Sequence, residues 1–581
     1  MNTDKRVLVA ILLSIAVWLL YESFLAPPRQ APPPVAATEK TEPASAPLPR
    51  HVPDAAVAAE SRPLPAEPGQ SITVHNSLYR MTLTETQAAI SSVRLFNYKE
   101  TLPPPAIIAW IRRTFKLRGD TDSRRTDNYK EMIGIEPGDP LPVKTSFVYP
   151  DGTLAAVSGW RAETTLLELN AQTRPAGISF SGLDQNLLQF SKRFVFNPGD
   201  YKITFDMVIT NTSSERIEGN PFLEWTAQRP QKRSGSFFGG GDTTAAPRFA
   251  YLIKDSAEKK DLHNIEEEII IQGDDVAWTA FEEKYFISAL IPEKERPAQV
   301  RLSGSPRLIS CKQVYPSIRL EPGQSQSYRF SIYMGPRDVN ILQQQGARLE
   351  RTIDFGWFDI IAKPLLLSLK FFNRFLHNYG LSIILLTIII KILFWPLTNK
   401  SFKSMKGMQK LQPEINALKE KYKDNREEFA RQQMELFKRY KVNPLGGCLP
   451  MLLQIPVFIA LYRALMDSIE LRHANFISFW INDLSAKDPT YIAPLVMGAS
   501  MFLQQKMTPS TLDPAQARIM MFMPVMFTVM FLNFPSGLVI YWLINNIISI
   551  AQQVYINRKH NDAGGIQCSP SSLKPKQPKK R

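Results

Sequence analysis

The chain is poor in the residues that staple small domains or hold metals. Its three cysteines, Cys311, Cys448 and Cys568, are odd in number and far apart, which excludes a disulfide framework. Its six histidines are scattered, with no pair at the spacing of metal ligands. We therefore expect no metal site and no cofactor.

The rest of the composition is uneven along the 581 residues. At about 150 residues per domain, this length allows three or four domains. Prolines crowd near the start, and long apolar runs lie at residues 7–25 and beyond residue 375. This distribution excludes a single soluble globule and a wholly disordered chain. A formal net charge of +15 predicts an acidic partner, either lipid headgroups or nucleic acid.

The first segment, residues 1–25, has Lys5 and Arg6 ahead of an apolar run. It could be a cleaved signal peptide, but no A-x-A site follows, and Pro27-Pro28 suits a cleavage point poorly. We favour a retained transmembrane anchor with a cytoplasmic N-terminus. Residues 26–69 hold twelve prolines and predict an extended, semi-rigid linker.

Residues 70–337 alternate apolar and polar positions, as in Tyr201–Asp206 and Tyr328–Ile332, and turn residues such as Asn197–Asp200 separate the runs. This pattern predicts an antiparallel β-sandwich. We find no catalytic motif in it. Gly239–Gly241 lacks the Lys-Ser/Thr of a phosphate loop, and Asp120 and Asp122 lack the other ligands of a calcium loop.

Residues 338–378 predict a helical connector that ends in an amphipathic interfacial helix over 357–376. Lys363, Lys370 and Arg374 recur at spacings of seven and four and so share one face, while aromatic and aliphatic residues fill the rest. The alternative is that this segment extends the next transmembrane helix.

Five further spans complete a polytopic α-helical membrane protein with six transmembrane helices, of which five form a core over residues 379–557. The five runs are Tyr379–Leu397, Leu449–Met466, Ile492–Gln505, Ile519–Phe534 and Ser536–Ile556. A bilayer core of about 30 Å needs about 20 helical residues. The runs from Ile492 and Ile519 are shorter, so either they are not full spans or the bilayer is thinned around them.

Basic residues set the orientation. They crowd into residues 399–443 and into the tail, 558–581, so both should be cytoplasmic, with the β domain outside. In 399–443, Met408, Leu411, Ile415 and Leu418 step by three and four, which predicts a helical hairpin with a coiled-coil seam; a solvated connector is the alternative. We expect ribosome or anionic-lipid contacts from Lys403, Lys406, Lys410, Lys579, Lys580 and Arg581.

Polar side chains inside the predicted spans carry the functional argument. Lys391 interrupts an apolar run, at a cost of roughly 2.5–3.5 kcal/mol at a helix centre. It could snorkel to the surface. However, other polar residues lie at a similar depth: Thr387, Gln454, Gln504, Gln505, Asn545, Asn546, Ser549, Gln552 and Gln553. They predict a hydrophilic groove open to the cytoplasm, although some of the amides could simply bond helices together.

Methionines cluster in the fourth and fifth spans, at Met497, Met501, Met520, Met521, Met523, Met526 and Met530. Flexible side chains suit a surface that accepts many apolar sequences. Ordinary core filling explains them equally well.

Four motifs resemble those of the YidC membrane protein insertases. They are Asn443–Pro450, Gln454–Phe458, Trp395–Thr398 and Phe534–Leu538. The likeness is close over residues 355–557. The anchor, linker and β domain resemble the Gram-negative form, whose periplasmic domain is a β-supersandwich.

The resemblance implies an insertase and chaperone of the bacterial inner membrane, without nucleotide hydrolysis, cofactor or enzymatic activity. Its partners would be nascent membrane proteins, the Sec translocon with its accessory subunits, the ribosome and anionic lipids, but no sequence-specific nucleic acid. The groove cation, typically arginine in the family, would be Lys391, which keeps the charge but lacks the planar fork. Tyr541 or Trp542 would stand where some relatives have a groove tyrosine. The apolar substrate slide on the third and fifth spans would comprise Leu452, Ile455, Phe458, Met523, Met526 and Met530.

Two other classes of protein compete with this interpretation. A secondary transporter could use Lys391 as a substrate or proton site, but the spans show no inverted repeat and no carboxylate in spans two to six. An envelope enzyme could act on sugars through the β domain, although no pair of catalytic carboxylates is evident.

Overall fold

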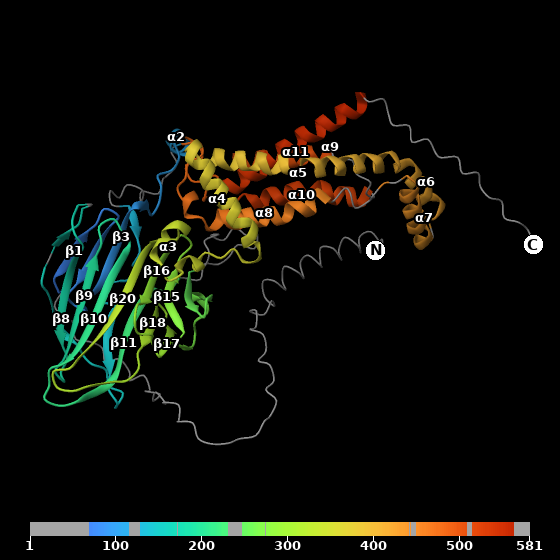
Figure 1. Ribbon diagram of the computed structural model, residues 1–581. Coiled ribbons are helices and arrows are strands. Elements are labelled where there is room, and N and C mark those ends of the chain that lie inside the picture. The colour runs from blue at the N-terminus through green and yellow to red at the C-terminus, as the bar shows by residue number, and fades with distance from the viewer. Residues whose placement is uncertain are drawn as a thin grey trace, which may run out of the picture. The chain divides into compact units, whose positions relative to one another are not determined.

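The computed structural model (Figure 1) describes residues 69–562 apart from 116–127, 137, 165, 171, 231–246, 274, 424, 441, 443–448 and 508–513. Several predicted features therefore lie outside the described residues. These are the anchor 1–25, nearly all of the linker 26–69, Gly239–Gly241, Asp120, Asp122, the start of the 443–450 motif, and the tail from residue 563 onward.

The strands of the β-rich part form three sheets. The first has the order β4-β3-β2-β1-β7, with β1 Ser71–His75, β2 Tyr79–Thr84, β3 Ala89–Lys99, β4 Tyr129–Glu131 and β7 Leu166–Glu168. The second has the order β13-β12-β15-β16-β20-β10-β9-β8-β6, with β6 Ser158–Ala162, β8 Ala176–Leu183, β9 Leu188–Phe196, β10 Lys202–Asn211, β12 Arg248–Ile253, β13 Ser256–Asp261, β15 Val276–Glu282, β16 Phe286–Pro292 and β20 Ser325–Pro336. The third has the order β14-β17-β18-β11-β19, with β11 Ile217–Gln228, β14 Ile269–Gln272, β17 Gln299–Gly304, β18 Leu308–Val314 and β19 Ile318–Leu320, and β5 Lys144–Val148 also pairs with β11.

The alternation seen in the sequence is the alternation of burial in the sheet. Along β10, every second residue from Ile203 to Ile209 is fully buried. β10 pairs antiparallel with β9 on one side and β20 on the other, so that Phe205 lies opposite both Phe194 and Phe330. These aromatic residues form the centre of the core. One pair departs from the predicted antiparallel pattern, because β7 runs parallel to β1.

Helices fill the remainder of the described chain. They are α2 Ala106–Thr114, α3 Val339–Gln345, α4 Asp359–Leu376, α5 Tyr379–Lys410, α6 Gln412–Lys421, α7 Arg426–Arg439, α8 Leu449–Asp467, α9 Ile492–Met507, α10 Pro514–Phe531 and α11 Ser536–Asp562. Short 3-10 turns are η3 Leu262–Asn264, η4 Leu349–Thr352, η5 Gly356–Phe358 and η7 Ile469–Leu471. Each of the five later runs is helical, but some bounds differ from the prediction. Helix α5 continues 13 residues beyond Leu397 to Lys410 and so includes the start of the predicted hairpin 399–443, and α10 begins five residues before Ile519.

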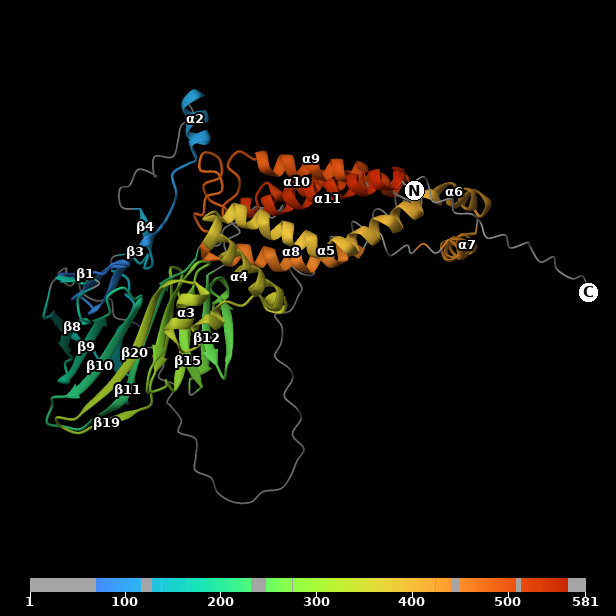
Figure 2. The same ribbon diagram turned by 45° about the horizontal axis from the view of Figure 1, so that its top comes forward.

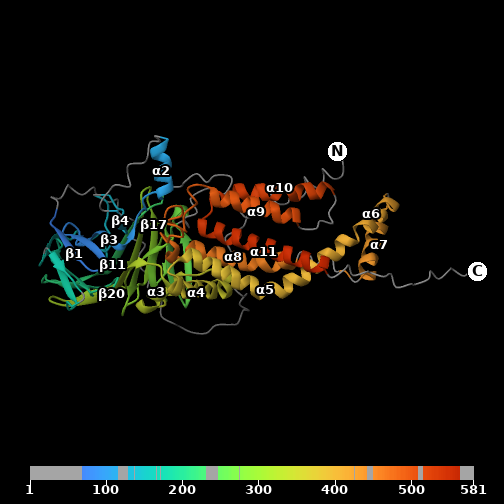
Figure 3. The same ribbon diagram turned by 90° about the horizontal axis from the view of Figure 1, so that it is seen from above.

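Two described helices are long and apolar enough to cross a membrane, Tyr379–Lys410 and Ser536–Arg558, and a shorter apolar helix covers Met520–Phe531. Figures 2 and 3 show α5, α8, α9 and α11 running alongside one another. Their buried sides meet in one apolar cluster that includes Leu386, Leu461, Met497 and Val539. Their outer sides remain apolar as well, which is what contact with lipid requires.

The predicted hairpin is present as α6 and α7, which follow the end of α5 (Figure 3). Leu411 and Ile415 pack against Leu436 and Phe437 in a small separate core. The second helix is capped by Asn425, whose side chain accepts from the backbone N–H of Glu428 at 3.1 Å.

The amphipathic helix α4 differs in one respect from its prediction. Lys363 and Lys370 share a face by spacing, but Lys370 does not reach a polar surface. Its ammonium lies between Asp338, at 3.1 Å, and Glu470, and its side chain is 17% exposed. Lys363 is exposed and pairs with Asp359 one turn away.

Candidate functional site

The two sides of α5 differ in chemistry at the depth of Lys391. Leu393 is 70% exposed and faces outward among other aliphatic residues. Lys391 is 8% exposed and points into the helices. This is the amphipathic pattern expected of a membrane helix that presents one polar position to the protein interior.

Lys391 begins a chain of hydrogen bonds that connects three helices. Its ammonium donates to Ser549 Oγ on α11 at 2.7 Å. Ser549 Oγ in turn donates to the backbone oxygen of Asn545 at 2.8 Å. On the other side, the amide of Gln454 on α8 donates to Asn545 Oδ1. The helices α5, α8 and α11 are therefore joined by the polar chain Lys391–Ser549–Asn545–Gln454.

Two further hydrogen bonds join α11 to α9. Asn546 Nδ2 donates to Ser500 Oγ at 3.2 Å, and Gln553 Nε2 donates to the backbone oxygen of Met507 at 2.6 Å. The sequence interpretation did not single out Ser500, although a hydroxyl within an apolar run was the available signal. Thr387 does not join either contact, because its hydroxyl donates to Ile383 O within α5 at 2.6 Å.

Several polar atoms beside this chain have no partner. Among the described residues, Tyr541 Oη, Trp542 Nε1 and both amide atoms of Gln552 are buried without a hydrogen bond. Each such group costs about 1–3 kcal/mol when it stays unpaired. The interior of these helices therefore holds more hydrogen-bonding capacity than its own side chains use.

Aromatic rings border the polar chain. Phe458 on α8 stacks on Tyr541 at 6.3 Å and meets Trp542 edge-on at 4.7 Å between ring centroids. Trp542 also contacts Phe527 and Phe531 of α10. Tyr541 is the more deeply buried of the two candidate groove residues, and Trp542 is half-buried.

The residues of the predicted apolar slide do not share one environment. Ile455 and Met526 are exposed, Met523 is half-buried, and Phe458 and Met530 pack partly against the apolar cluster of the helices. The side chain of Leu452 lies outside the described residues.

The β-rich part contains a cleft of about 1130 Å³ whose lining includes Glu131 and Glu282. Glu131 accepts from Ser92 Oγ and from two backbone amides. Glu282 forms ion pairs with Lys259 at 3.1 Å and Arg337 at 3.8 Å. Both carboxylates are thus engaged in holding the strands together. The described residues contain no cluster of three metal-ligating side chains.

Comparison with known proteins covers both parts of the chain. A family model described as 60Kd inner membrane protein matches residues 371–563, and one described as YidC periplasmic domain matches residues 136–368. The membrane protein insertase YidC of Syntrophus aciditrophicus (strain SB) is 41% identical over 574 residues, covering 96% of this chain and 100% of that protein. That of Geotalea daltonii is 40% identical over 574 residues, covering 96% of this chain and 99% of the relative.

The chain belongs to the YidC membrane protein insertase family. Its β-rich part corresponds to the YidC periplasmic domain, and its later helices correspond to the membrane-insertase region. A solved structure of an active YidC insertase aligns with 84% of this chain and 95% of its own chain at 16% identity, with a TM-score of 0.35.

Three of the basic residues from which we expected ribosome or lipid contacts lie on α5 and not on the hairpin helices α6 and α7. Lys403 and Lys410 are exposed, and Lys406 is half-buried. Lys579, Lys580 and Arg581 lie outside the described residues.

Proposed function

We propose that this chain inserts hydrophobic segments of nascent proteins into the bacterial inner membrane, alone or with the Sec translocon, and helps them fold without hydrolysing nucleotide. The names of its close relatives support the activity. The observation that carries the mechanism is the polar chain that begins at Lys391. In this chain a cation on α5 is bonded to a hydroxyl on α11, and that hydroxyl is linked to amides on α8 and α11.

The proposed topology has six spans, with both termini in the cytoplasm and a β-supersandwich in the periplasm. The exposed aliphatic residues of α5 support contact with lipid, and the exposed Lys403 and Lys410 support a cytoplasmic hairpin. Helix α9 has 16 residues, roughly 24 Å at about 1.5 Å per residue. This length is short for a bilayer core of about 30 Å and favours local thinning.

The polar chain would act as a hydrophilic groove open to the cytoplasm. A carboxylate of the substrate's leading tail would be drawn to the Lys391 ammonium, whose described partner is a hydroxyl rather than a carboxylate. The unpaired atoms of Tyr541 and Gln552 would bond to water or to the entering backbone. The apolar segment of the substrate would then leave past exposed side chains such as Ile455 and Met526. The ribosome and anionic lipid would meet the basic hairpin and tail.

Charge reversal at the groove tests this mechanism. In reconstituted vesicles, Lys391→Glu should reduce insertion of a substrate with an acidic N-terminal tail at least tenfold, and Lys391→Arg should retain it. Two unit charges about 4 Å apart interact by about 4 kcal/mol at an effective dielectric constant of about 20, which is ample for that loss.

The matched control is Lys400→Glu, which makes the same change in net charge at an exposed position of the same helix. It should leave insertion nearly unchanged. Normal insertion by the Lys391→Glu protein would remove charge attraction from the mechanism.

A further inference from the structure

Helix α2, Ala106–Thr114, belongs to neither the sheets nor the bundle of apolar helices. None of its residues is buried. Trp110 is 63% exposed, and Phe115, which ends the helix, is 68% exposed. Together with the half-buried Ile107, Ile108 and Ile111, these two side chains make an apolar surface of the kind that contacts a partner or a membrane.

The helix is strongly two-sided. At 100° per residue, Ile107, Ile111, Phe115, Ile108 and Trp110 fall within one arc of roughly 160°. Arg112 and Arg113 lie on either side of that arc, and no acidic residue lies in the first turn. The arginines complement the negative end of the helix dipole, but the dipole gives no reason for the exposed aromatic side.

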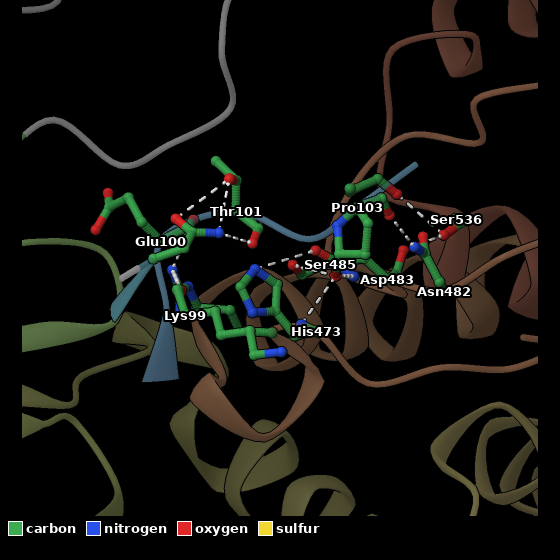
Figure 4. Close-up of polar contacts among 12 residues, drawn as sticks. Lys99, Glu100, Thr101, Pro103, His473, Asn482, Asp483, Ser485 and Ser536 are labelled. Atoms are coloured by element: carbon green, nitrogen blue, oxygen red, sulfur yellow. Dashed lines mark hydrogen bonds and ion pairs between the residues drawn. The ribbon is translucent and has the colours of Figure 1, made fainter. Parts of the chain in front are cut away.

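Hydrogen bonds join the start of α2 to the connection between α8 and α9, which we define as residues 468–491. Asn482 Nδ2 donates to the backbone oxygen of Pro103 at 2.8 Å, and Figure 4 shows this side chain directed at Pro103. The backbone N–H of Ile107 donates to Phe479 O at 3.0 Å. Phe479 is itself exposed. Just before α2, Arg472 donates to the backbone oxygens of Lys99 and Glu100 at 2.6 and 3.2 Å.

The connection 468–491 joins two apolar helices, so it lies where those helices leave the bilayer. A helix bonded to it is held close to the lipid headgroups. An aromatic and aliphatic side flanked by arginines is the composition of helices that lie in the plane of a membrane surface. The arginine stems can pack along the apolar side while their guanidinium groups reach phosphates.

We propose that α2 is a membrane-surface helix whose Trp110 side enters the headgroup region of the outer leaflet, at a depth of about 5–10 Å. This proposal rests on the proposed placement of the apolar helices in the membrane. It gives the β-rich part a lipid contact of its own, separate from α4, and fixes that part of the chain at the surface beside the outer ends of α8 and α9.

Photocrosslinking in the full-length protein tests the contact. Benzoylphenylalanine replaces Trp110 in one variant and Ala109, on the opposite side of α2, in its matched control. The variants are reconstituted in phosphatidylethanolamine and phosphatidylglycerol vesicles and also studied in native membranes, and adducts are identified by mass. We expect a severalfold excess of lipid adducts at position 110 over position 109.

Benzoylphenylalanine at Leu393 separates the two proposals. Lipid adducts at position 393 without any at position 110 would overturn the α2 contact alone, whereas none at either position would overturn the membrane placement. Adducts at position 110 to protein, or equal lipid adducts at 109 and 110, would also refute the α2 contact. The variant Arg112→Glu/Arg113→Glu should lower the yield at position 110 and leave that at 393 unchanged.

Discussion

The ion cluster at Lys370 connects three elements that are far apart in the sequence, and its loss should loosen them together. Asp338 precedes α3, Lys370 lies on α4, and Glu470 follows α8. The variant Lys370→Met would leave two carboxylates facing each other without a cation. Their side chains are 17% and 11% exposed. Removing one partner of a buried ion pair costs about 3–5 kcal/mol.

We expect a value near the lower end of that range, because Asp338 keeps backbone partners. Its carboxylate accepts from the N–H groups of Asn340 at 2.7 Å and Ile341 at 3.3 Å. Hydrogen exchange of the full-length protein in detergent measures the local opening free energy of α3 and α4. The control is Lys363→Met on the same helix, whose ion pair with Asp359 is exposed and should be worth about 1 kcal/mol or less. Equal protection in the two variants would refute the reasoning.

The same cluster has a pH dependence with a definite sign. Burial by itself would raise the pKa of Asp338, but Lys370 and the two backbone amides lower it below its ordinary value. The stabilisation by Asp338 is therefore present above that ordinary value and is lost as pH falls through the lower, folded pKa. Burial raises the pKa of Glu470, and Lys370 offsets this only in part. Ionised Glu470 thus carries a cost at neutral pH, so Glu470→Gln should loosen α3 and α4 less than Lys370→Met does.

Two further predictions concern single sites. Burial raises the pKa of Cys311 to about 12, so at pH 8 only about one molecule in 10⁴ carries the thiolate. Mass spectrometry should therefore find Cys311 unmodified by maleimide in the folded protein and modified after denaturation. Rapid labelling of Cys311 in the folded protein would contradict this. A Cβ at Gly498 of α9 would overlap the Thr528 side chain of α10. Gly498→Val should therefore destabilise the protein by about 1–3 kcal/mol, measured by thermal unfolding in detergent. The control Ala499→Val, at an exposed position of the same helix, should leave the stability unchanged.

Periodic features of this chain could be predicted from the sequence because they are local. The alternation around Ile203 and the apolar run after Tyr379 each specify one element, and the structure has a strand and a helix there. The motifs around Gln454 and Phe534 specified the family.

The features that the sequence did not reveal are set by tertiary contacts, by local hydrogen bonds or by elements too short to show a period. Lys370 was assigned to a basic face by its spacing from Lys363, whereas its partners Asp338 and Glu470 lie on other elements. Thr387 is buried on α5 as Lys391 is, but its hydroxyl donates to the backbone oxygen of Ile383 within the same helix. Helix α2 follows three prolines and is nine residues long, too short for its period to stand out.

In the proposed mechanism, Lys391 suits a passing substrate and Lys370 does not, because the two lysines differ in their partners. Lys370 is neutralised by two carboxylates that are always present, so its charge is already used in joining elements of the chain. Among the described residues, Lys391 bonds to a neutral hydroxyl and has no carboxylate within ion-pair distance. A neutral acceptor orients the ammonium without cancelling its charge. The helices therefore bear the desolvation cost of a cation that is not neutralised within the described residues, and in the proposed mechanism the acidic tail of an entering segment is the group that it attracts.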